Sequence, residues 1–229
     1  MISIDTVYQK VLALANKEQR GYITPQEFNL LAKQAQMEIF EQYFYDEKTE
    51  DKNLKNSLEF SNMEEMLDEK ISVFKKTSTL AVAANIATLP SDLYRLGTVF
   101  DSNKDIEIEQ VTEQRRREIA SSPLTAPSMV YPVFVRMNDV NLALYPTPVG
   151  AVINCHYIKT PLDPNWTYVV VNEKALYNAT NVSNFQLHPS DEAELVYKIL
   201  SLAGIVIAKP GLGTYSDQQI IKQQQQEKV

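Results

Sequence analysis

Apolar residues near the N-terminus recur at steps of three and four, the spacing that places them on one face of a helix. This stripe extends from Ile4 to Ala15 and predicts a helix over that range. Thr24 and Glu27 stand on either side of a proline in the pattern of a capping box, in which side chains and backbone cap each other. A second helix is therefore expected to begin there and to run to about Asp46.

The second predicted helix has two apolar faces when its residues are placed at 100° per residue. One face carries Phe28, Leu31, Ala32, Ala35, Ile39 and Tyr43, and the other carries Leu30, Met37, Phe40 and Phe44. Two interpretations stay open: a central helix in a monomeric bundle, or a helix whose second face packs on a neighbouring subunit. On the second interpretation, that second face is a candidate subunit interface.

The pattern changes at about Thr77, where short runs of β-branched and aromatic residues alternate with Pro, Asn, Asp and Gly. A third helix, opened by a capping box at Ser61–Glu64, is expected to run through about Lys75, just before this change. Asn138 and Asp139 form a plausible hairpin turn between two strands. The candidate strands are residues 78–82, 86–89, 96–101, 105–111, 130–137, 140–145, 152–159 and 168–171, with one short helix at 113–120.

The C-terminal part of the chain is expected to hold one long helix, capped by Ser190 and stopped by Pro210. Its second half is apolar almost all round, which implies burial among other helices. The residues after it are rich in glutamine and have only Tyr215, Ile220 and Ile221 as apolar anchors. This end is either a floppy tail or an arm that orders against a partner. If it is an arm, those three residues are candidate contacts to a portal or a neighbouring subunit.

These elements predict an α+β chain. Its N-terminal and C-terminal helices are expected to form a helical bundle, with an inserted mainly antiparallel β domain and an extended C-terminal arm. The expected parts are an N-terminal helical part, a β-rich domain, a C-terminal helix that completes the bundle, and the arm. Their boundaries are residues 1–76, 77–172, 173–213 and 214–229.

Composition and charge narrow the class of protein. Hydrophobic residues make up 44% of the 229 residues and charged residues 22%, which are ordinary values for a globular chain. The net charge of −7 works against binding nucleic acid by charge neutralisation, although a mildly negative wall suits a conduit through which DNA slides. The one cysteine, Cys155, leaves no partner for an internal disulfide, and the first residues lack the features of an export signal. We therefore expect synthesis in the cytoplasm and, without a long apolar run, no membrane span.

The sequence offers little catalytic or metal-binding chemistry. Cys155 and His156 are adjacent in a predicted strand and so point to opposite faces, while His188 lies in the turn before a helix. Residues 101–105 imitate the start of a calcium loop, but the glycine and the glutamate that such a loop needs are missing. No phosphate-binding loop or nucleophile elbow occurs. We predict no catalytic residue, no cofactor and no metal, and therefore no enzyme; a hydrolase that uses surface carboxylates is the remaining enzymatic alternative.

Arg115, Arg116 and Arg117 form the one basic cluster. On a helix they radiate over about 200°, so they cannot form a single phosphate-binding stripe. They are expected either to pair with Glu113 and Glu118 on a solvated helix or, for one of them, to contact a carboxylate of a partner or DNA. The three arginines are therefore candidate charge contacts to a partner protein or to DNA.

The two ends of the chain resemble a known family. The resemblance is carried by VYQKVLALANKEQRGYITPQEFNLLAKQAQMEIFEQYF at residues 7–44 and LHPSDEAELVYKILSLAGIVIAKPGLGTYSDQQIIKQQQQEKV at residues 187–229. Both are similar to structural proteins of podovirus-like tailed bacteriophages, particularly the head-to-tail adaptor or ring proteins of the crAss-like group. The order of helices, sheet, helix and arm also matches.

The resemblance implies a structural virion protein at the head–tail junction, made in the cytoplasm of the host bacterium. Such a subunit forms a ring, commonly twelvefold, that connects the portal protein to the tail while double-stranded DNA passes through the lumen without sequence-specific binding. The arm from Tyr215 to Val229 is then expected to lie along the portal or a neighbouring subunit, and the sheet region to meet tail or further ring proteins. The alternative is another virion or assembly protein, such as a tail-tube or internal protein.

Overall fold

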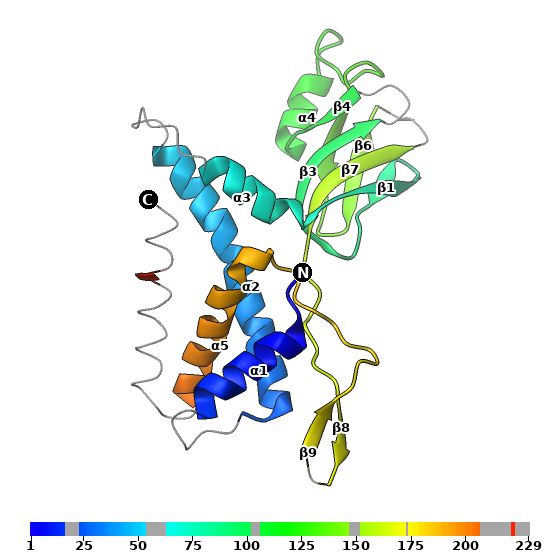
Figure 1. Cartoon of the computed structure of the whole chain (residues 1–229). Coiled ribbons are helices and arrows are strands. Elements are labelled where there is room, and N and C mark those ends of the chain that lie inside the picture. Colours follow the sequence, from blue (N-terminus) through cyan, green and yellow to red (C-terminus); the bar gives the residue numbers. More distant parts are fainter. Residues whose placement is uncertain are drawn as a thin grey trace. The chain divides into compact units, whose positions relative to one another are not determined.

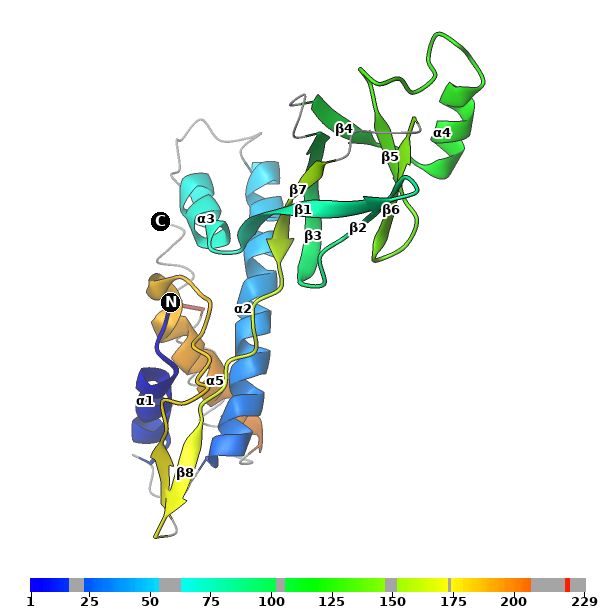
Figure 2. The ribbon, with the colours of Figure 1, turned by 90° about the vertical axis from the view of Figure 1, so that its right-hand side faces the viewer.

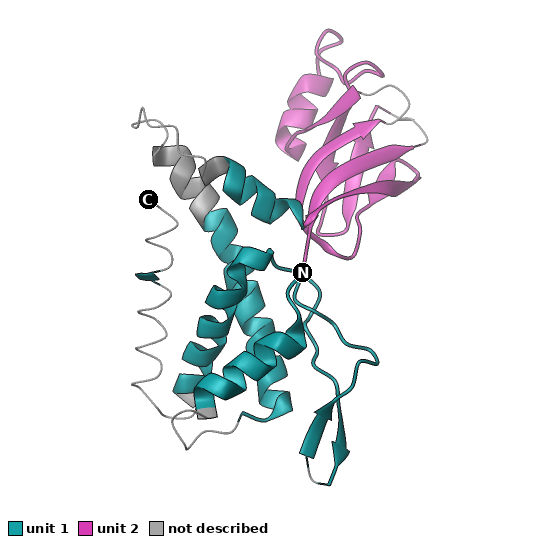
Figure 3. Ribbon diagram, in the orientation of Figure 1, with its two compact units in different colours: residues 1–73, 161–229 teal, residues 74–160 magenta. Residues whose placement is uncertain are grey.

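The computed structural model describes residues 1–16, 23–53, 63–101, 106–146, 152–172, 174–206 and 221–222. The chain divides into two compact units, shown in different colours in Figure 3. Residues 1–73 and 161–229 form the first, called here the helical unit, and residues 74–160 form the second, called the barrel unit.

The helical unit contains four α-helices and one hairpin in its described residues (Figure 1). Helix α2 contacts both α3 and α5, and α1 contacts α5. The core is formed by the apolar stripes of these helices, including the stripe predicted for the first helix, which is buried at Ile4, Val7, Tyr8, Val11 and Ala15. The elements are α1 (Ile4–Asn16), α2 (Pro25–Asn53), α3 (Met63–Ser72), β8 (Tyr168–Val171), β9 (Lys174–Tyr177), the 3-10 turn η1 (Pro189–Asp191) and α5 (Glu192–Val206).

The start of α2 confirms the predicted capping box. The Thr24 amide donates to Glu27 Oε2 at 2.9 Å, and the Glu27 amide donates to Thr24 Oγ1 at 3.3 Å. The start of the last helix differs from the prediction, because Ser190 lies inside η1 and does not cap α5. His188 is the capping residue of that turn, and its Nδ1 accepts from the Ser190 amide.

The barrel unit is a closed barrel of seven strands, in the order β1-β2-β6-β5-β4-β3-β7 (Figure 2). Neighbouring strands are antiparallel except β4 and β5, which pair in parallel. Helix α4 (Glu113–Ala120) lies in the connection between these two strands, which gives the chain the length that a parallel crossover needs. The strands are β1 (Lys75–Ala83), β2 (Ile86–Thr88), β3 (Leu93–Asp101), β4 (Ile106–Gln110), β5 (Val133–Arg136), β6 (Asn141–Tyr145) and β7 (Ile153–Lys159).

Alternate side chains of the strands point inward and fill the barrel core. Ile153, Cys155 and Tyr157 on β7 point inward and are buried, while His156 between them is exposed. Gly97 on β3 permits the close approach of β3 to β7, since a Cβ at this position would lie 2.9 Å from the backbone oxygen of His156. Cys155 and His156 therefore lie on opposite faces of their strand, as predicted.

The predicted fold class is wrong. The structure is mixed α/β, with a closed seven-stranded barrel and five α-helices in the described residues, not a helical bundle with an inserted mainly antiparallel β domain. The alternation of polar and apolar residues shows which residues share a face of a strand, but it does not show which strands pair with one another. Here β1 is long enough to pair with β7 through residues 75–80 and with β2 through residues 81–83, and this shared strand closes the sheet on itself.

The strand predicted at residues 168–171 lies outside the barrel. It is β8, which pairs with β9 to form a separate two-stranded sheet in the helical unit. Strand β9 was not predicted. Asn172, between the two strands, has a φ of 49°, the left-handed conformation that asparagine adopts in tight hairpin turns.

Candidate functional site

Among the described residues of the helical unit, exposed large apolar side chains are most densely grouped on the β8–β9 hairpin. Val169, Val170, Val171, Leu176 and Tyr177 are each between 43% and 64% exposed. From the pairing of the strands, Val169, Val171 and Leu176 share one face, and Val170 and Tyr177 share the other. Apolar side chains are therefore exposed on both faces of one short ribbon.

The base of the hairpin is fixed to α1 and α2 around Trp166. The Trp166 ring is buried and lies 4.2 Å, between centroids, from the Tyr8 ring on α1. Its Nε1–H donates to Asp5 Oδ1 at 3.0 Å, and its backbone amide donates to Asn29 Oδ1 on α2 at 2.8 Å. The Asn29 amide group returns a bond to the Trp166 carbonyl at 3.1 Å. The Tyr168 ring is stacked with that of Trp166, 5.8 Å between centroids.

A second set of bonds closes the two strands at the base. The Thr167 hydroxyl donates to the carbonyl oxygens of Asn178 and Thr180, and the Asn178 amide donates to the Thr167 carbonyl at 2.9 Å. Asn165 and Ser183 exchange backbone bonds at 3.0 and 3.1 Å. The ribbon is thus held at its root and extends past the ends of α1 and α2 in both views (Figures 1 and 2). A rigid root that carries strands with exposed apolar side chains is the arrangement of a docking element.

The predicted interface residues of α2 fall into two groups. Leu30 is 71% exposed and Met37 is partly buried, so both remain on the surface. Phe40 is fully buried, and Phe44 is 8% exposed with its ring 5.1 Å from that of Phe40. Because α3 and α5 both contact α2, the chain itself covers this half of the second face. The structure therefore does not bring the four residues together as one exposed surface.

Of the predicted arm residues, Tyr215 and Ile220 lie outside the described residues. Ile221 is described, and its side chain is 53% exposed. Ser61 and Asn62 of the second predicted capping box also lie outside the described residues, as do residues 102–105 of the calcium-loop mimic.

The three arginines lie on α4 and pair with its carboxylates, the first of the two expectations for them. Arg116 forms a two-point contact with Glu113 through Nε at 2.8 Å and Nη2 at 2.6 Å, and Arg117 Nε reaches the same carboxylate at 3.0 Å. Arg115 pairs with Glu118 at 3.2 Å. The hydrogen bonds from Arg116 and then Arg117 lower the pKa of Glu113 to about 2.

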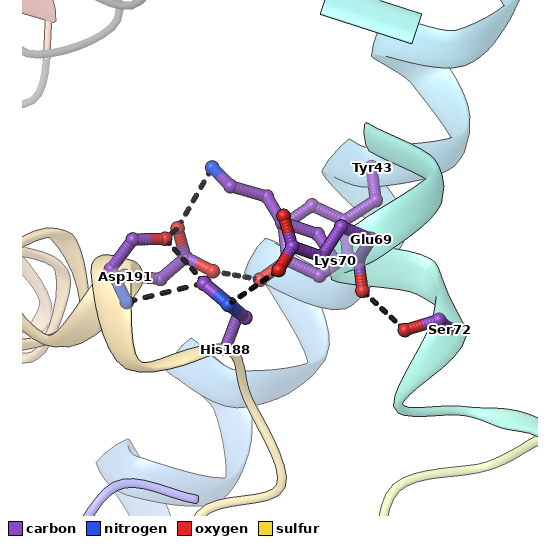
Figure 4. A network of polar contacts seen from close by, with 7 residues as sticks. Tyr43, Glu69, Lys70, Ser72, His188 and Asp191 are labelled. Carbon is purple, nitrogen blue, oxygen red and sulfur yellow. Dashed lines mark hydrogen bonds and ion pairs between the residues drawn. The ribbon is translucent and has the colours of Figure 1, made fainter. Parts of the chain in front are cut away.

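A buried polar cluster joins α2, α3 and the start of α5 (Figure 4). Asp191 is fully buried, and its Oδ1 lies 2.9 Å from Lys70 Nζ on α3. The Tyr43 hydroxyl of α2 donates to Asp191 Oδ2, and the Ser190 hydroxyl donates to Oδ1 at 3.1 Å. Both oxygens of the carboxylate are thus satisfied, which is the condition under which a buried ion pair is tolerated. The cluster fixes three helices to one another.

Ser190, His188 and Glu69 lie in a row beside this cluster, but they do not form the relay of a serine hydrolase. His188 Nδ1 is 2.8 Å from Ser190 Oγ and also accepts from the Ser190 amide at 3.3 Å. The Ser190 hydroxyl has Asp191 as its acceptor, and His188 Nε2 is 3.9 Å from Glu69, beyond hydrogen-bond reach. His188 instead caps the turn before α5. In the described residues, no group of three or more His, Cys, Asp and Glu side chains is placed to hold a metal ion.

A groove of about 590 Å³ lies between α1 and the start of α5. Its wall contains Ala13 and Leu14 of α1 and Ala193, Val196 and Tyr197 of α5. Lys10 of α1 and Glu192 of α5 also line the groove, and their ion pair, 2.6 Å between Nζ and Oε1, links the two helices. The groove therefore combines an apolar wall with a few polar and charged side chains, as sites that bind apolar groups commonly do.

Comparison with known proteins places the chain in no family: no family model matches it, and no curated protein matches it at a significant level. The resemblance to phage adaptor proteins therefore stays a prediction. None of the described helices is both long enough and apolar enough to cross a membrane.

Sequence reasoning missed the hairpin as a site. The signal was present in the run Tyr168–Val171, which is apolar at every position and is followed at once by Asn172. The same run of apolar residues is found in a strand buried inside a sheet and in an exposed ribbon with two apolar faces. The run was therefore assigned to a strand of the β domain. The second strand, KALY at residues 174–177, is too short and too mixed to be recognised on its own.

Proposed function

We propose that this chain is a non-enzymatic structural subunit of a tailed-phage virion that assembles into a homo-oligomeric ring at the head–tail junction. The ring, twelvefold by the resemblance, would join the portal protein to tail or further ring proteins around the DNA channel. The single observation that carries the proposal is the β8–β9 hairpin, apolar on both faces and rigidly held at its root.

Physical reasoning favours an assembly role for this hairpin. A two-stranded ribbon is marginally stable in water by itself, and exposed apolar side chains on both faces gain nothing from solvent. The bonds around Trp166 and Thr167 hold the ribbon in one conformation before any partner arrives, which lowers the entropic cost of binding. Such an arrangement is expected of a subunit that is completed by its neighbours.

The distribution of charge supports a structural role beside DNA and not tight binding to it. The barrel unit has nine Lys and Arg against eight Asp and Glu, and the helical unit has thirteen against twenty-one. Neither unit has the basic surplus that phosphate neutralisation requires. The arginines of α4 are already paired with Glu113 and Glu118, which favours passage of DNA without sequence-specific contacts.

The proposal is tested by measuring assembly of the purified full-length chain by native mass spectrometry and electron microscopy. We expect closed rings, alone or on addition of the portal protein. The double variant Val169→Lys/Leu176→Lys places charge on one face of the hairpin and should weaken assembly at least about tenfold, while the fluorescence of Trp166 stays native.

The matched control is Val140→Lys, which puts the same charge on a comparably exposed valine in the barrel unit. It should leave the ring intact. A chain that stays monomeric at high concentration and ignores the portal would overturn the proposal, and so would hairpin lysines without effect. Locating the chain in the intact particle separates a head–tail adaptor from a tail-tube or internal protein.

A further inference from the structure

The hairpin and the groove between α1 and α5 lie on opposite sides of the same helix. Tyr8 of α1 contacts Trp166 at the hairpin root. Lys10, Ala13 and Leu14, which line the groove, lie about 140° to 240° around the helix axis from Tyr8. A copy of the chain therefore presents an apolar projection on one side of α1 and an apolar recess on the other.

From this relationship we infer that the β8–β9 hairpin of one copy docks into the α1–α5 groove of the next copy. The inference rests on the proposed function, since it names the contact through which the ring is built. The hairpin cannot reach the groove of its own copy, because its root is bonded to Asp5 of α1 and Asn29 of α2. A hairpin that fills an α1–α5 groove must therefore come from another copy.

The two surfaces match in chemistry. The hairpin carries apolar side chains on both faces, and the groove has an apolar wall of Ala13, Leu14, Ala193 and Val196. The hairpin contributes no net charge, because Glu173 and Lys174 are its two charged residues. The hairpin therefore adds no charge repulsion of its own to a contact with the acidic helical unit of the next copy.

The symmetry of this contact fits a ring. A projection that enters a different surface on the next copy makes a heterologous, head-to-tail interface, and repetition of that interface closes into a ring when the rotation between copies allows it. Pairing of two hairpins with each other would instead be isologous and would stop at a dimer.

Cysteine cross-linking of mixed variants tests the inference in the full-length chain. Val170→Cys places a thiol on the hairpin, and Ala193→Cys places one at the groove, both at exposed positions. The native Cys155 is fully buried and its pKa is raised by burial, so it does not compete for oxidation. We expect a disulfide-linked dimer in an equal mixture of the two variants and little in either variant alone. The chain with both cysteines should give a ladder that ends at the ring size.

The outcomes separate the inference from the proposed function. Rings with no cross-link between Val170→Cys and Ala193→Cys would overturn the hairpin-in-groove contact and leave the ring in place. Cross-linking of Val170→Cys with itself would show that two hairpins pair with each other, and it would also overturn the hairpin-in-groove contact.

Two further variants test other origins of a cross-link. A cross-link from Ala193→Cys to Ile221→Cys, in place of one to Val170→Cys, would assign the groove to the C-terminal segment. Equal cross-linking of Ala193→Cys with Asp139→Cys, an exposed control in the barrel unit, would reveal random collision, which counts against the contact. A strictly monomeric chain would overturn both proposals.

Discussion

Lys70 and Asp191 form an ion pair of 2.9 Å between α3 and the turn before α5, with the carboxylate fully buried and the ammonium group nearly so. The same carboxylate accepts from Tyr43 of α2, so one side chain holds three helices together. Removing one partner of a buried pair leaves an uncompensated charge, which is far more costly than the pair itself is stabilising.

Lys70→Met is expected to lower the free energy of unfolding of the helical unit by about 3–5 kcal/mol, since it strands the Asp191 carboxylate. Trp166 is the only tryptophan and lies in the helical unit, so its fluorescence in a urea titration reports this unit. The matched control is Lys33→Met, which breaks an exposed pair with Asp163 and should cost less than about 1 kcal/mol. Equal losses of unfolding free energy in the two variants would mean that burial does not determine how much the Lys70–Asp191 ion pair matters for stability.

Gly97→Ala is expected to destabilise the barrel by about 1–3 kcal/mol. The added Cβ would lie 2.9 Å from the His156 backbone oxygen, so β3 and β7 must move apart at the irregularity in their pairing between Leu96 and Val99. Cys155 is the only cysteine and is buried in the barrel, so the rate at which a thiol reagent labels it measures barrel opening. Labelling should accelerate in Gly97→Ala and stay unchanged in the neighbouring exposed variant Thr98→Ala; unchanged labelling in both would show that the strands absorb the methyl group.

The sequence predicted individual elements better than their arrangement. Helix α4 was predicted with the bounds that the structure has, because its charged run is closed by Ser121 and a proline. The capping box at Thr24 was also read correctly, since its residues interact within one helical turn. Barrel closure depends instead on the pairing of β1 with β7, whose paired residues are 73 to 83 positions apart in the chain, and no local pattern encodes that contact.

The candidate interface on α2 also shows that local pattern was predictable from the sequence and packing between distant segments was not. Periodicity placed Phe40 and Leu30 correctly on a second apolar face of the helix. It could not show that other helices of the same chain would cover Phe40 and leave Leu30 in solvent, since that depends on packing between distant segments. The hairpin was missed for a related reason: four apolar residues in a row describe a strand but do not say whether a sheet covers it.

The different burial of Phe40 and Leu30 leads to a direct comparison on one helix. Phe40→Ala should lower the free energy of unfolding of the helical unit by about 3–5 kcal/mol, because it removes a fully buried ring. Leu30→Ala should change it by no more than about 0.5 kcal/mol. Both values come from urea titrations followed by Trp166 fluorescence. A large loss of stability for Leu30→Ala would mean that this leucine is covered in solution, which self-association at the working concentration would explain and dilution would reverse.

The Glu113 carboxyl gives α4 a defined response to acid. Its pKa in the folded chain is about 2, below the ordinary value of 4.5, because Arg116 and then Arg117 donate hydrogen bonds to it. A lowered folded pKa means that the ionic contribution is complete above about pH 4.5 and is lost as the pH falls through about 2. Carbon-13 NMR titration of the side-chain carboxyl should give this midpoint. In Arg116→Gln/Arg117→Gln the midpoint should return toward 4.5; a midpoint near 4.5 in the unmodified chain would show that the pairs do not form in solution.

Asn29 connects the stability of the hairpin root to the proposed assembly. Its side chain accepts from the Trp166 amide and donates to the Trp166 carbonyl and to Asn165 Oδ1, so Asn29→Ala leaves backbone groups beside a buried ring without partners. We expect a loss of about 1–3 kcal/mol in the helical unit and faster hydrogen exchange of the amides at residues 168–177. Because no apolar side chain of the hairpin is changed, any weakening of ring assembly in this variant measures how much the fixed conformation of the root contributes to the free energy of assembly.

Gln34→Ala, which removes only an exposed bond to Glu38 on the same helix, is the control. Unaltered exchange at the hairpin in Asn29→Ala would show that the ribbon is held by other contacts, and rings of full strength despite faster exchange would show that assembly does not depend on its rigidity.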